Sequence, residues 1–259
     1  MSTPLLECRG LDIRYADRVL VRALDWEIRE GERWLLAGPN GAGKSSLLLV
    51  MAGARRADAG SVHLCGAAIA TWSAPQLAGL RALVTDRWSD PFALAARKLV
   101  AAARYRMESD GGHDGDVGAQ RVEASLGDMD CLDLAGRDVR RLSRGERQRI
   151  ALAAALVQEA RLLLLDEPLS HQDPRHQMLV LERLARKNQS TCVAAMHNIS
   201  AAANFATHAL LLSGDGSWFA GPVDEMLTVV MLETIFGTKI AQFESGKHRV
   251  FVSASGAPV

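Results

Sequence analysis

Aromatic residues are scarce in this sequence of 259 residues, with five tryptophans, two tyrosines and six phenylalanines. Proteins that bind single-stranded nucleic acids stack the bases on aromatic side chains, so this scarcity argues against that class. An excess of one charge is also missing, because 30 lysines and arginines balance 30 aspartates and glutamates. A balanced charge gives no general attraction to nucleic acid or to an acidic polymer. The composition therefore predicts no nucleic-acid partner.

Cysteines and long apolar runs are also few. Three of the four cysteines lie in apolar surroundings, where buried structural thiols are expected, and no close pair has metal-ligand spacing. This usage fits a reducing compartment. No apolar run approaches the roughly 18 residues of a spanning helix, and the N-terminal segment lacks the pattern of a signal peptide. We expect a cytoplasmic chain whose membrane role, if it has one, comes through a partner.

The order of apolar segments predicts the fold class. Residues 6–15 and 19–28 alternate apolar with polar positions, as half-buried antiparallel strands do. Later strands are short and almost wholly apolar, at residues 162–166, 191–197 and 208–213, and helical segments separate them. Strands and helices that alternate in this way form a parallel sheet covered on both faces. We expect an α/β fold with a mixed, largely parallel sheet, an N-terminal antiparallel β-subdomain and an inserted α-helical subdomain.

We expect the chain to form a single domain with four parts. Residues 1–91 form a core with the antiparallel β-subdomain and a glycine-rich loop. Residues 92–141 form the helical subdomain, which a polar, glycine-rich loop at residues 108–118 interrupts. Residues 142–236 return to the core, and residues 237–259 form a short β tail, expected as a hairpin.

The glycine-rich loop carries the strongest chemical signal. Its sequence GPNGAGKS matches the pattern G-x-x-x-x-G-K-[ST] in full and stands between a short apolar strand and a helix. Glycines let backbone N–H groups curl around phosphate oxygens, and the helix N-terminus adds partial positive charge. Lys44 is suited to contact the β- and γ-phosphates, and the Ser45 hydroxyl to ligate Mg²⁺. The residues expected to bind the nucleotide are Gly38, Pro39, Asn40, Gly41, Ala42, Gly43, Lys44, Ser45 and Ser46. The sequence therefore predicts a P-loop NTPase core that binds a nucleoside triphosphate and magnesium.

Two adjacent acids follow a strand of four leucines. Asp166 and Glu167 stand at the end of LLLLDE, and ligands of open α/β sheets gather at the carboxyl ends of the strands. Asp166 is suited to hold Mg²⁺, directly or through water. Glu167 is suited to act as a general base toward a water that attacks the γ-phosphate. We therefore expect hydrolysis rather than transfer to a second substrate.

Several spaced motifs together resemble the ATP-binding cassette (ABC) proteins. The segment LSRGE at residues 142–146 is similar to the family signature, usually written LSGGQ, and precedes the acid pair at the family's distance. The resemblance spans essentially the whole chain and includes SHQD at residues 170–173. It implies that the ligand is ATP and that Tyr15 stacks on the adenine. It also implies that Asp173 shapes a loop across a dimer contact and that His197 contacts the γ-phosphate.

The resemblance further implies a homodimer. In the family two cassettes face each other head to tail, and the signature of one caps the ATP held by the other. The signature residues of this chain, which would act on the partner's nucleotide, are Ser143, Arg144, Gly145 and Glu146. The paired acids would serve the ATP of their own subunit.

Two positions depart from the family pattern. Arg144 stands where the family mostly has glycine, while Gly145 is kept. A guanidinium near a phosphate helps binding, but its bulk also opposes closure of the dimer. The family's glutamine before the helical insert falls at Asp86 by spacing. Asp86 is expected either to ligate Mg²⁺ and contact the nucleotide site, or to be a turn residue outside it.

The end of the chain narrows the resemblance. Residues 237–253, GTKIAQFESGKHRVFVS, resemble the tails of ATPase subunits of bacterial importers for cobalamin, ferric siderophores and haem. Residues 197–212 are most similar to the cobalamin group. The resemblance implies a peripheral subunit at the cytoplasmic face of the inner membrane, with a transmembrane permease and a periplasmic substrate-binding protein as partners. We expect residues 92–104 to contact the permease.

Two alternatives remain open at this point. One is a soluble ABC-type ATPase that acts on ribosomes or DNA, although such proteins usually carry two cassettes or long coiled-coil inserts. The other is a weakly active regulatory cassette, which the intact Lys44, Asp166 and Glu167 disfavour and Asp86 keeps open.

Overall fold

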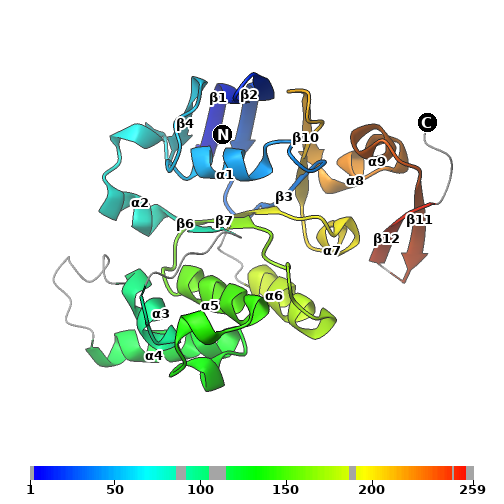
Figure 1. The fold of residues 1–259 in the computed structure, drawn as a ribbon. Helices are drawn as coiled ribbons and strands as arrows, with labels where there is room; N and C mark the ends of the chain where they lie inside the picture. The colour runs from blue at the N-terminus through cyan, green and yellow to red at the C-terminus, as the bar shows by residue number, and fades with distance from the viewer. Residues whose placement is uncertain (1–2, 86–91, 105–114, 187–190, 247, 255–259) are drawn as a thin grey trace. The chain divides into compact units, whose positions relative to one another are not determined.

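The structure is a computed structural model (Figure 1) that describes residues 3–85, 92–104, 115–186, 191–246 and 248–254. These residues divide into two compact units. The first unit contains residues 1–71 and 191–259, and the second contains residues 72–190.

The first unit begins with an antiparallel sheet in the strand order β2-β1-β4-β5. Its strands are β1 (Leu6–Tyr15), β2 (Arg18–Ile28), β4 (Ala59–Leu64) and β5 (Ala67–Ala68). The predicted alternation is confirmed, since Leu6, Cys8, Leu11 and Ile13 of β1 are buried. The alternation breaks once, between Cys8 and Leu11, where the register of β1 against β2 shifts.

The second sheet of this unit is largely parallel. Its strands are β3 (Arg33–Ala37), β8 (Thr191–Ala195), β9 (His208–Leu212) and β10 (Trp218–Pro222). β3 pairs in parallel with both β8 and β9, and β10 pairs antiparallel with β9. All five residues of β8 are buried, as expected for a strand covered on both faces.

The helices of the first unit follow its strands. They are α1 (Lys44–Met51), α7 (Ile199–Ala203), α8 (Val223–Met226) and α9 (Val229–Phe236), with a 3₁₀ turn at Ile69–Thr71. The tail after α9 is an antiparallel hairpin of β11 (Ile240–Ser245) and β12 (His248–Ser253), which confirms the predicted hairpin. Figure 1 shows this hairpin beside α7 and α9.

The second unit is mostly helical. Among its described residues, the strands β6 (Arg81–Val84) and β7 (Leu162–Asp166) pair in parallel. Its helices are α2 (Ala74–Leu80), α3 (Ala96–Arg104), α4 (Gly115–Asp128), α5 (Arg144–Leu156) and α6 (Pro174–Arg186). In the described part of this unit, 3₁₀ turns lie at Leu132–Leu134 and Val139–Arg141. Within the described ranges, no helix of either unit has both the length and the apolar character needed to cross a membrane.

Two local features of the second unit differ from the sequence prediction. Helix α2 was not predicted, although Ser73 and Gln76 form a capping box at its start. The loop expected at residues 108–118 ends earlier, because residues 115–118 already belong to α4. Glycine content favours a loop, but α4 buries Val122 and Leu126 and packs on α3 and α5, so tertiary packing prevails over propensity. The bounds of the four predicted parts stay a prediction.

Burial makes three of the four cysteines poor nucleophiles. Cys8, Cys131 and Cys192 are buried free thiols, as predicted, whereas Cys65 is only half-buried. Burial raises the pKa of the Cys8 and Cys192 thiols to about 12 and the pKa of the Cys131 thiol to about 11. Because the thiolate is the reactive form, these three thiols stay protonated and unreactive at pH 8.

We therefore expect iodoacetamide at pH 8 to label Cys65 alone in the folded protein and all four cysteines in guanidinium chloride. Peptide mass spectrometry measures the labelling, with Cys65→Ser as the unlabelled control. Native labelling of Cys8 or Cys192 at the rate of Cys65 would contradict the burial described here.

Candidate functional site

The glycine-rich loop joins the end of β3 to the start of α1 in the first unit. Gly38, Gly41 and Gly43 have φ angles of +150°, +79° and +104°, which side chains rarely adopt. A Cβ on Gly38 would overlap the carbonyl oxygen of Leu212, and one on Gly43 would lie 2.9 Å from Leu20 Cβ. The shape of the loop therefore depends on glycine at these positions.

Lys44 lies along this loop. Its Nζ donates to the carbonyl oxygens of Gly38 at 2.8 Å and Pro39 at 3.1 Å, and the residue is buried. Ser45 is exposed in the first turn of α1. The lysine charge and the N-terminal end of α1 thus add positive potential at one loop, which suits a phosphate group.

The end of β1 carries the predicted adenine contact. Tyr15 is 70% exposed, which leaves it open for stacking. Arg55 links the neighbouring residue to the first turn of α1, because its guanidinium donates to the carbonyl oxygen of Arg14 and to Ser46 Oγ, the latter at 3.0 Å. The Asp58 carboxylate lies 3.8 Å from the same guanidinium and accepts from the Arg14 N–H at 2.7 Å. Sequence reasoning missed Arg55, which belongs to no motif.

His197 and the phosphate loop both follow the carboxyl ends of neighbouring parallel strands. β3 and β8 are parallel neighbours with Leu36 opposite Ala195, and the Met196 N–H donates to the Leu36 carbonyl oxygen at 3.3 Å. Gly38 and His197 each stand two residues beyond this pair of positions. The His197 side chain is exposed. Within the first unit, therefore, the loop and the histidine start side by side.

The acid pair stands at the end of β7 in the second unit. Asp166 is buried, with 8% of its surface exposed. Glu167 has a left-handed φ of +51°, which is uncommon for a residue with a side chain. Its carbonyl oxygen accepts from Ser170 N at 3.1 Å and Ser170 Oγ at 2.9 Å, so a tight turn holds this backbone. Such strained positions cluster at functional sites.

The signature forms the start of α5. Ser143 is the N-cap and shares a capping box with Glu146: Ser143 Oγ accepts from the Glu146 N–H at 3.3 Å, and the Glu146 carboxylate accepts from the Ser143 N–H at 2.8 Å. The hydrogen bonds from Ser143 lower the pKa of Glu146, and the bond from the Ser143 backbone N–H has the largest effect.

Only one of the two glycine positions of the signature is sterically constrained within this unit. A Cβ on Gly145 would lie 2.5 Å from the carbonyl oxygen of His171, so glycine is needed there. Arg144 is exposed and meets no such limit. Within this unit, glycine is therefore required at position 145, whereas the arginine at position 144 lies at the surface.

Gln172 ties the signature to the loop after the acids. Its Nε2 donates to the Gly145 carbonyl oxygen at 2.9 Å, and its Oε1 accepts from Arg149 at 3.0 Å. The side chains of Gln172 and Arg149 are both buried. The next residue, Asp173, accepts from the His176 N–H and contacts its ring nitrogen, both at 2.9 Å, and these bonds lower the pKa of Asp173. Sequence reasoning named Asp173 but missed Gln172 and Arg149.

The structure groups the predicted residues within each unit. Tyr15, the phosphate loop and His197 belong to the first unit, and the acids, the signature and Asp173 belong to the second. Asp86 lies outside the described residues, so its predicted role stays a prediction.

A magnesium ion fits the chemistry of the donors that are present. Among the described residues, no cluster of three or more histidines, cysteines, aspartates or glutamates forms a metal cage. Mg²⁺ in nucleotide sites is held instead by one or two protein oxygens, phosphates and water. The exposed Ser45 hydroxyl and the Asp166 carboxylate are oxygen donors of that kind.

The parallel sheet, the loop and the helix after it define a P-loop nucleotide-binding protein. Residues 21–170 match the family model described as ABC transporter. Among solved structures, one described as an inward-facing conformation of a metal-chelate type ABC transporter is 25% identical, with a TM-score of 0.81, and the match covers 97% of this chain and 98% of that chain.

Curated relatives agree with this match. The hemin import ATP-binding protein HmuV of Streptomyces coelicolor is 36% identical over 237 residues, 90% of this chain and 84% of that protein. The iron(3+)-hydroxamate import ATP-binding protein FhuC of Bacillus subtilis is 33% identical over 234 residues, 89% of this chain and 87% of that protein. The cobalamin import ATP-binding protein BtuD of Halobacterium salinarum is 33% identical over 239 residues, 91% of this chain and 60% of that protein.

The chain belongs to the ABC transporter family. It is an ATPase, and the predicted fold class and the resemblance are confirmed.

Proposed function

We propose that this chain is the ATP-hydrolysing subunit of a membrane importer for a metal chelate, namely cobalamin, an iron–siderophore or haem. The observation that carries the proposal is the set of relatives named for import of these compounds, each matched over about nine-tenths of this chain. The three compounds share one chemical character, a metal ion enclosed by a large organic ligand. Within this class, the relatives do not favour the cobalamin group that residues 197–212 resemble.

The proposed partners are a second copy of this chain, a transmembrane permease and a periplasmic substrate-binding protein, at the cytoplasmic face of the inner membrane. Phe92, at the start of the helical segment, supports a docking surface, because its side chain is 77% exposed. Arg97, Lys98 and Ala101 of α3 are exposed beyond it. An exposed aromatic side chain beside basic and small residues suits contact with a helix of a partner protein.

We assign the phosphate loop to the triphosphate and Tyr15 to the adenine. Lys44 neutralises negative charge on the β- and γ-phosphates, and His197 donates a hydrogen bond to the γ-phosphate. Ser45 and Asp166 hold Mg²⁺, which would offset the negative charge of the triphosphate when bound.

Glu167 is proposed as the general base. Its carboxylate accepts a proton from the water that attacks the γ-phosphorus, and the bond to the bridging oxygen of ADP breaks. The Ser143 hydroxyl and the Gly145 N–H would donate to the γ-phosphate held by the partner copy, with Arg144 and Glu146 beside them and Asp173 at the contact between copies.

The proposal is tested by uptake into cells that lack this chain. Cobalamin, a ferric hydroxamate and haem, each labelled in the metal, are supplied separately. We expect uptake of one of them to be lost, and to return with the wild-type chain but not with Lys44→Ala. Unchanged uptake of all three would contradict the proposed class of substrate.

Phe92→Glu tests the docking surface in the same assay. A carboxylate in an apolar contact is costly, so we expect uptake to fall at least tenfold while ATP binding by the isolated chain is unchanged. Val230→Glu is the matched control, because Val230 is similarly exposed at 75% but lies on α9 of the other unit. Equal uptake by the two variants would mean that the permease binds elsewhere.

A further inference from the structure

The helix that follows His197 is too short to hold its own position. α7 contains five residues, Ile199–Ala203, and begins two residues after the histidine. Its N-cap, Asn198, accepts a hydrogen bond from the Ala201 N–H at 3.0 Å. Isolated helices of this length are unstable, so contacts outside the helix must fix it.

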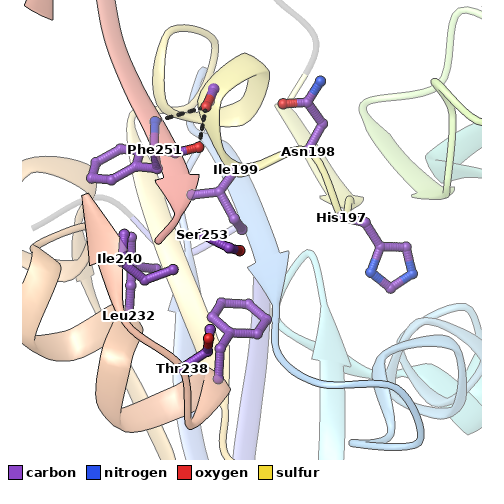
Figure 2. Close-up of a pocket in the computed structure, with 10 residues that line it drawn as sticks. His197, Asn198, Ile199, Leu232, Thr238, Ile240, Phe251 and Ser253 are labelled. Atoms are coloured by element: carbon purple, nitrogen blue, oxygen red, sulfur yellow. Dashed lines mark hydrogen bonds between the residues drawn. The ribbon is translucent and has the colours of Figure 1, made fainter. Parts of the chain in front are cut away.

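α7 contacts β3 of the sheet and β12 of the C-terminal hairpin, and the side-chain hydrogen bonds described next go to the hairpin (Figure 2). Ser200 Oγ accepts from the Phe251 N–H at 2.8 Å and donates to the Phe251 carbonyl oxygen at 3.1 Å. One helical turn later, Asn204 Nδ2 donates to the Arg249 carbonyl oxygen at 3.2 Å, and Asn204 Oδ1 accepts from the Arg249 N–H at 3.3 Å. Each side chain therefore satisfies both backbone groups of one residue of β12.

These hydrogen bonds resemble those that a neighbouring antiparallel strand would make to the outer edge of β12. In an antiparallel ladder, every second residue exchanges two hydrogen bonds with the residue opposite. β12 pairs with β11 along one edge, and Arg249 and Phe251 are alternate residues whose backbone groups meet α7 at the other. Ser200 and Asn204 thus fasten α7 to the hairpin at two points, and we call this pair the tail clamp.

A cavity lies beside the segment that joins His197 to the clamp. It has a volume of about 340 Å³ and is bordered by residues 197–200, with Leu232 and Phe236 of α9 and Ile240 of β11 among the other lining residues. Figure 2 shows the ring of His197 directed away from the hairpin side chains. On the cavity side the segment after His197 lacks close packing, and the clamp supplies its hydrogen bonds to the hairpin. On its other side α7 packs on β3, with Ala202 and Ala203 buried.

We propose that Ser200 and Asn204 are positioning residues through which the C-terminal hairpin sets the place of His197 for hydrolysis. The inference rests on the proposed contact of His197 with the γ-phosphate. The segment is held to the sheet by the hydrogen bond from Met196 to β3 and by the packing of α7 on β3, and to the hairpin by the clamp. Loss of the clamp would let the start of α7 shift on the sheet, and the shift would move the imidazole of His197 away from the phosphate.

The first test is an isosteric pair at Ser200. Ser200 lines the cavity. Ser200→Thr keeps the hydroxyl, whereas Ser200→Val has the shape of threonine without the hydroxyl. We expect Ser200→Thr to hydrolyse ATP at nearly the wild-type rate. We expect kcat of Ser200→Val, and of the double variant Ser200→Ala/Asn204→Ala, to fall by roughly 10- to 100-fold, as misplacement of a reacting group does.

Three readouts separate positioning from general damage. ADP affinity should stay within about twofold, because ADP has no γ-phosphate for His197 to contact. The control Phe243→Ala/Val252→Ala alters two exposed side chains of the same hairpin and should leave kcat unchanged. In a His197→Ala background, loss of the clamp should have no further effect on kcat, because the two changes act through one group.

The outcomes distinguish the clamp from the function on which it rests. If His197→Ala hydrolyses ATP normally, the proposed role of His197 is wrong. If His197→Ala is impaired but Ser200→Val matches Ser200→Thr, or the effects of clamp and histidine multiply, the clamp does not act through His197.

Discussion

Glu167→Gln is expected to lower ATP turnover by roughly 10²–10⁴, the usual contribution of a positioned general base, while ATP binding persists. Glutamine keeps the size of the side chain, but it replaces one carboxylate oxygen with an NH2 donor, and the amide accepts no proton from water. The backbone of residue 167 is held by its carbonyl hydrogen bonds to Ser170, which the substitution leaves in place. Phosphate release measures turnover, and the fluorescence of a labelled ATP analogue measures binding.

Glu159→Gln is the matched control for this prediction. Glu159 belongs to the same unit and shares the left-handed backbone, with a φ of +52° against +51° at Glu167. Its carboxylate is half-exposed and pairs with Arg121 at 2.8 Å, an interaction of the kind worth about 0–1 kcal/mol. We expect Glu159→Gln to hydrolyse ATP normally. Wild-type turnover by Glu167→Gln would contradict the proposed role of Glu167 as the general base.

Mixing two inactive variants is expected to restore hydrolysis. If the signature completes the ATP site of a partner copy, Lys44→Ala and Ser143→Arg should each be nearly inactive alone. In a mixed dimer one composite site carries both changes and the other carries neither, as the two-fold symmetry of such a dimer requires. Recovery should therefore reach at most about half of the wild-type rate per mixed dimer.

Ser143→Asp separates the two roles of the serine. Aspartate caps a helix as well as serine does, so α5 keeps its start, but the added negative charge repels a phosphate. We expect this variant to behave like Ser143→Arg, both alone and in the mixture. Coupling between the sites would blunt recovery, so light scattering of Glu167→Gln with ATP provides a second measurement. A protein that stays monomeric there, and recovers nothing on mixing, would not work as a face-to-face pair.

The strands and the fold class were predictable because their residues report directly on burial. Residues 6–15 alternate and residues 162–165 are wholly apolar, and each pattern has one stable placement in a sheet. Helix α2 escaped prediction because its seven residues give too short a window for a helical period, although its cap at Ser73 was visible. The start of α4 escaped because packing on α3 and α5 offsets the cost of its glycines.

In the candidate site, too, some residues were predictable from the sequence and others were not. The phosphate loop, the acids and the signature are short segments in which each residue type is required by the ligand or by the local backbone. Arg55 and Gln172 were not predictable, because their partners Arg14 and Gly145 stand 41 and 27 residues away in the chain. Only the fold brings these pairs together, and a lone arginine or glutamine in a sequence does not indicate a functional site.

Because Glu167 has a left-handed backbone, selection for folding and selection for activity should favour different residues at this position. A residue with a Cβ in this conformation costs about 1–3 kcal/mol, which glycine avoids and asparagine reduces. A library randomised at this position and selected for folding alone should drift toward glycine and asparagine. The same library selected for growth on the substrate of the proposed importer should return to the acid. The residue found at position 167 in a variant of this chain therefore indicates whether the variant was selected for folding or for ATP hydrolysis.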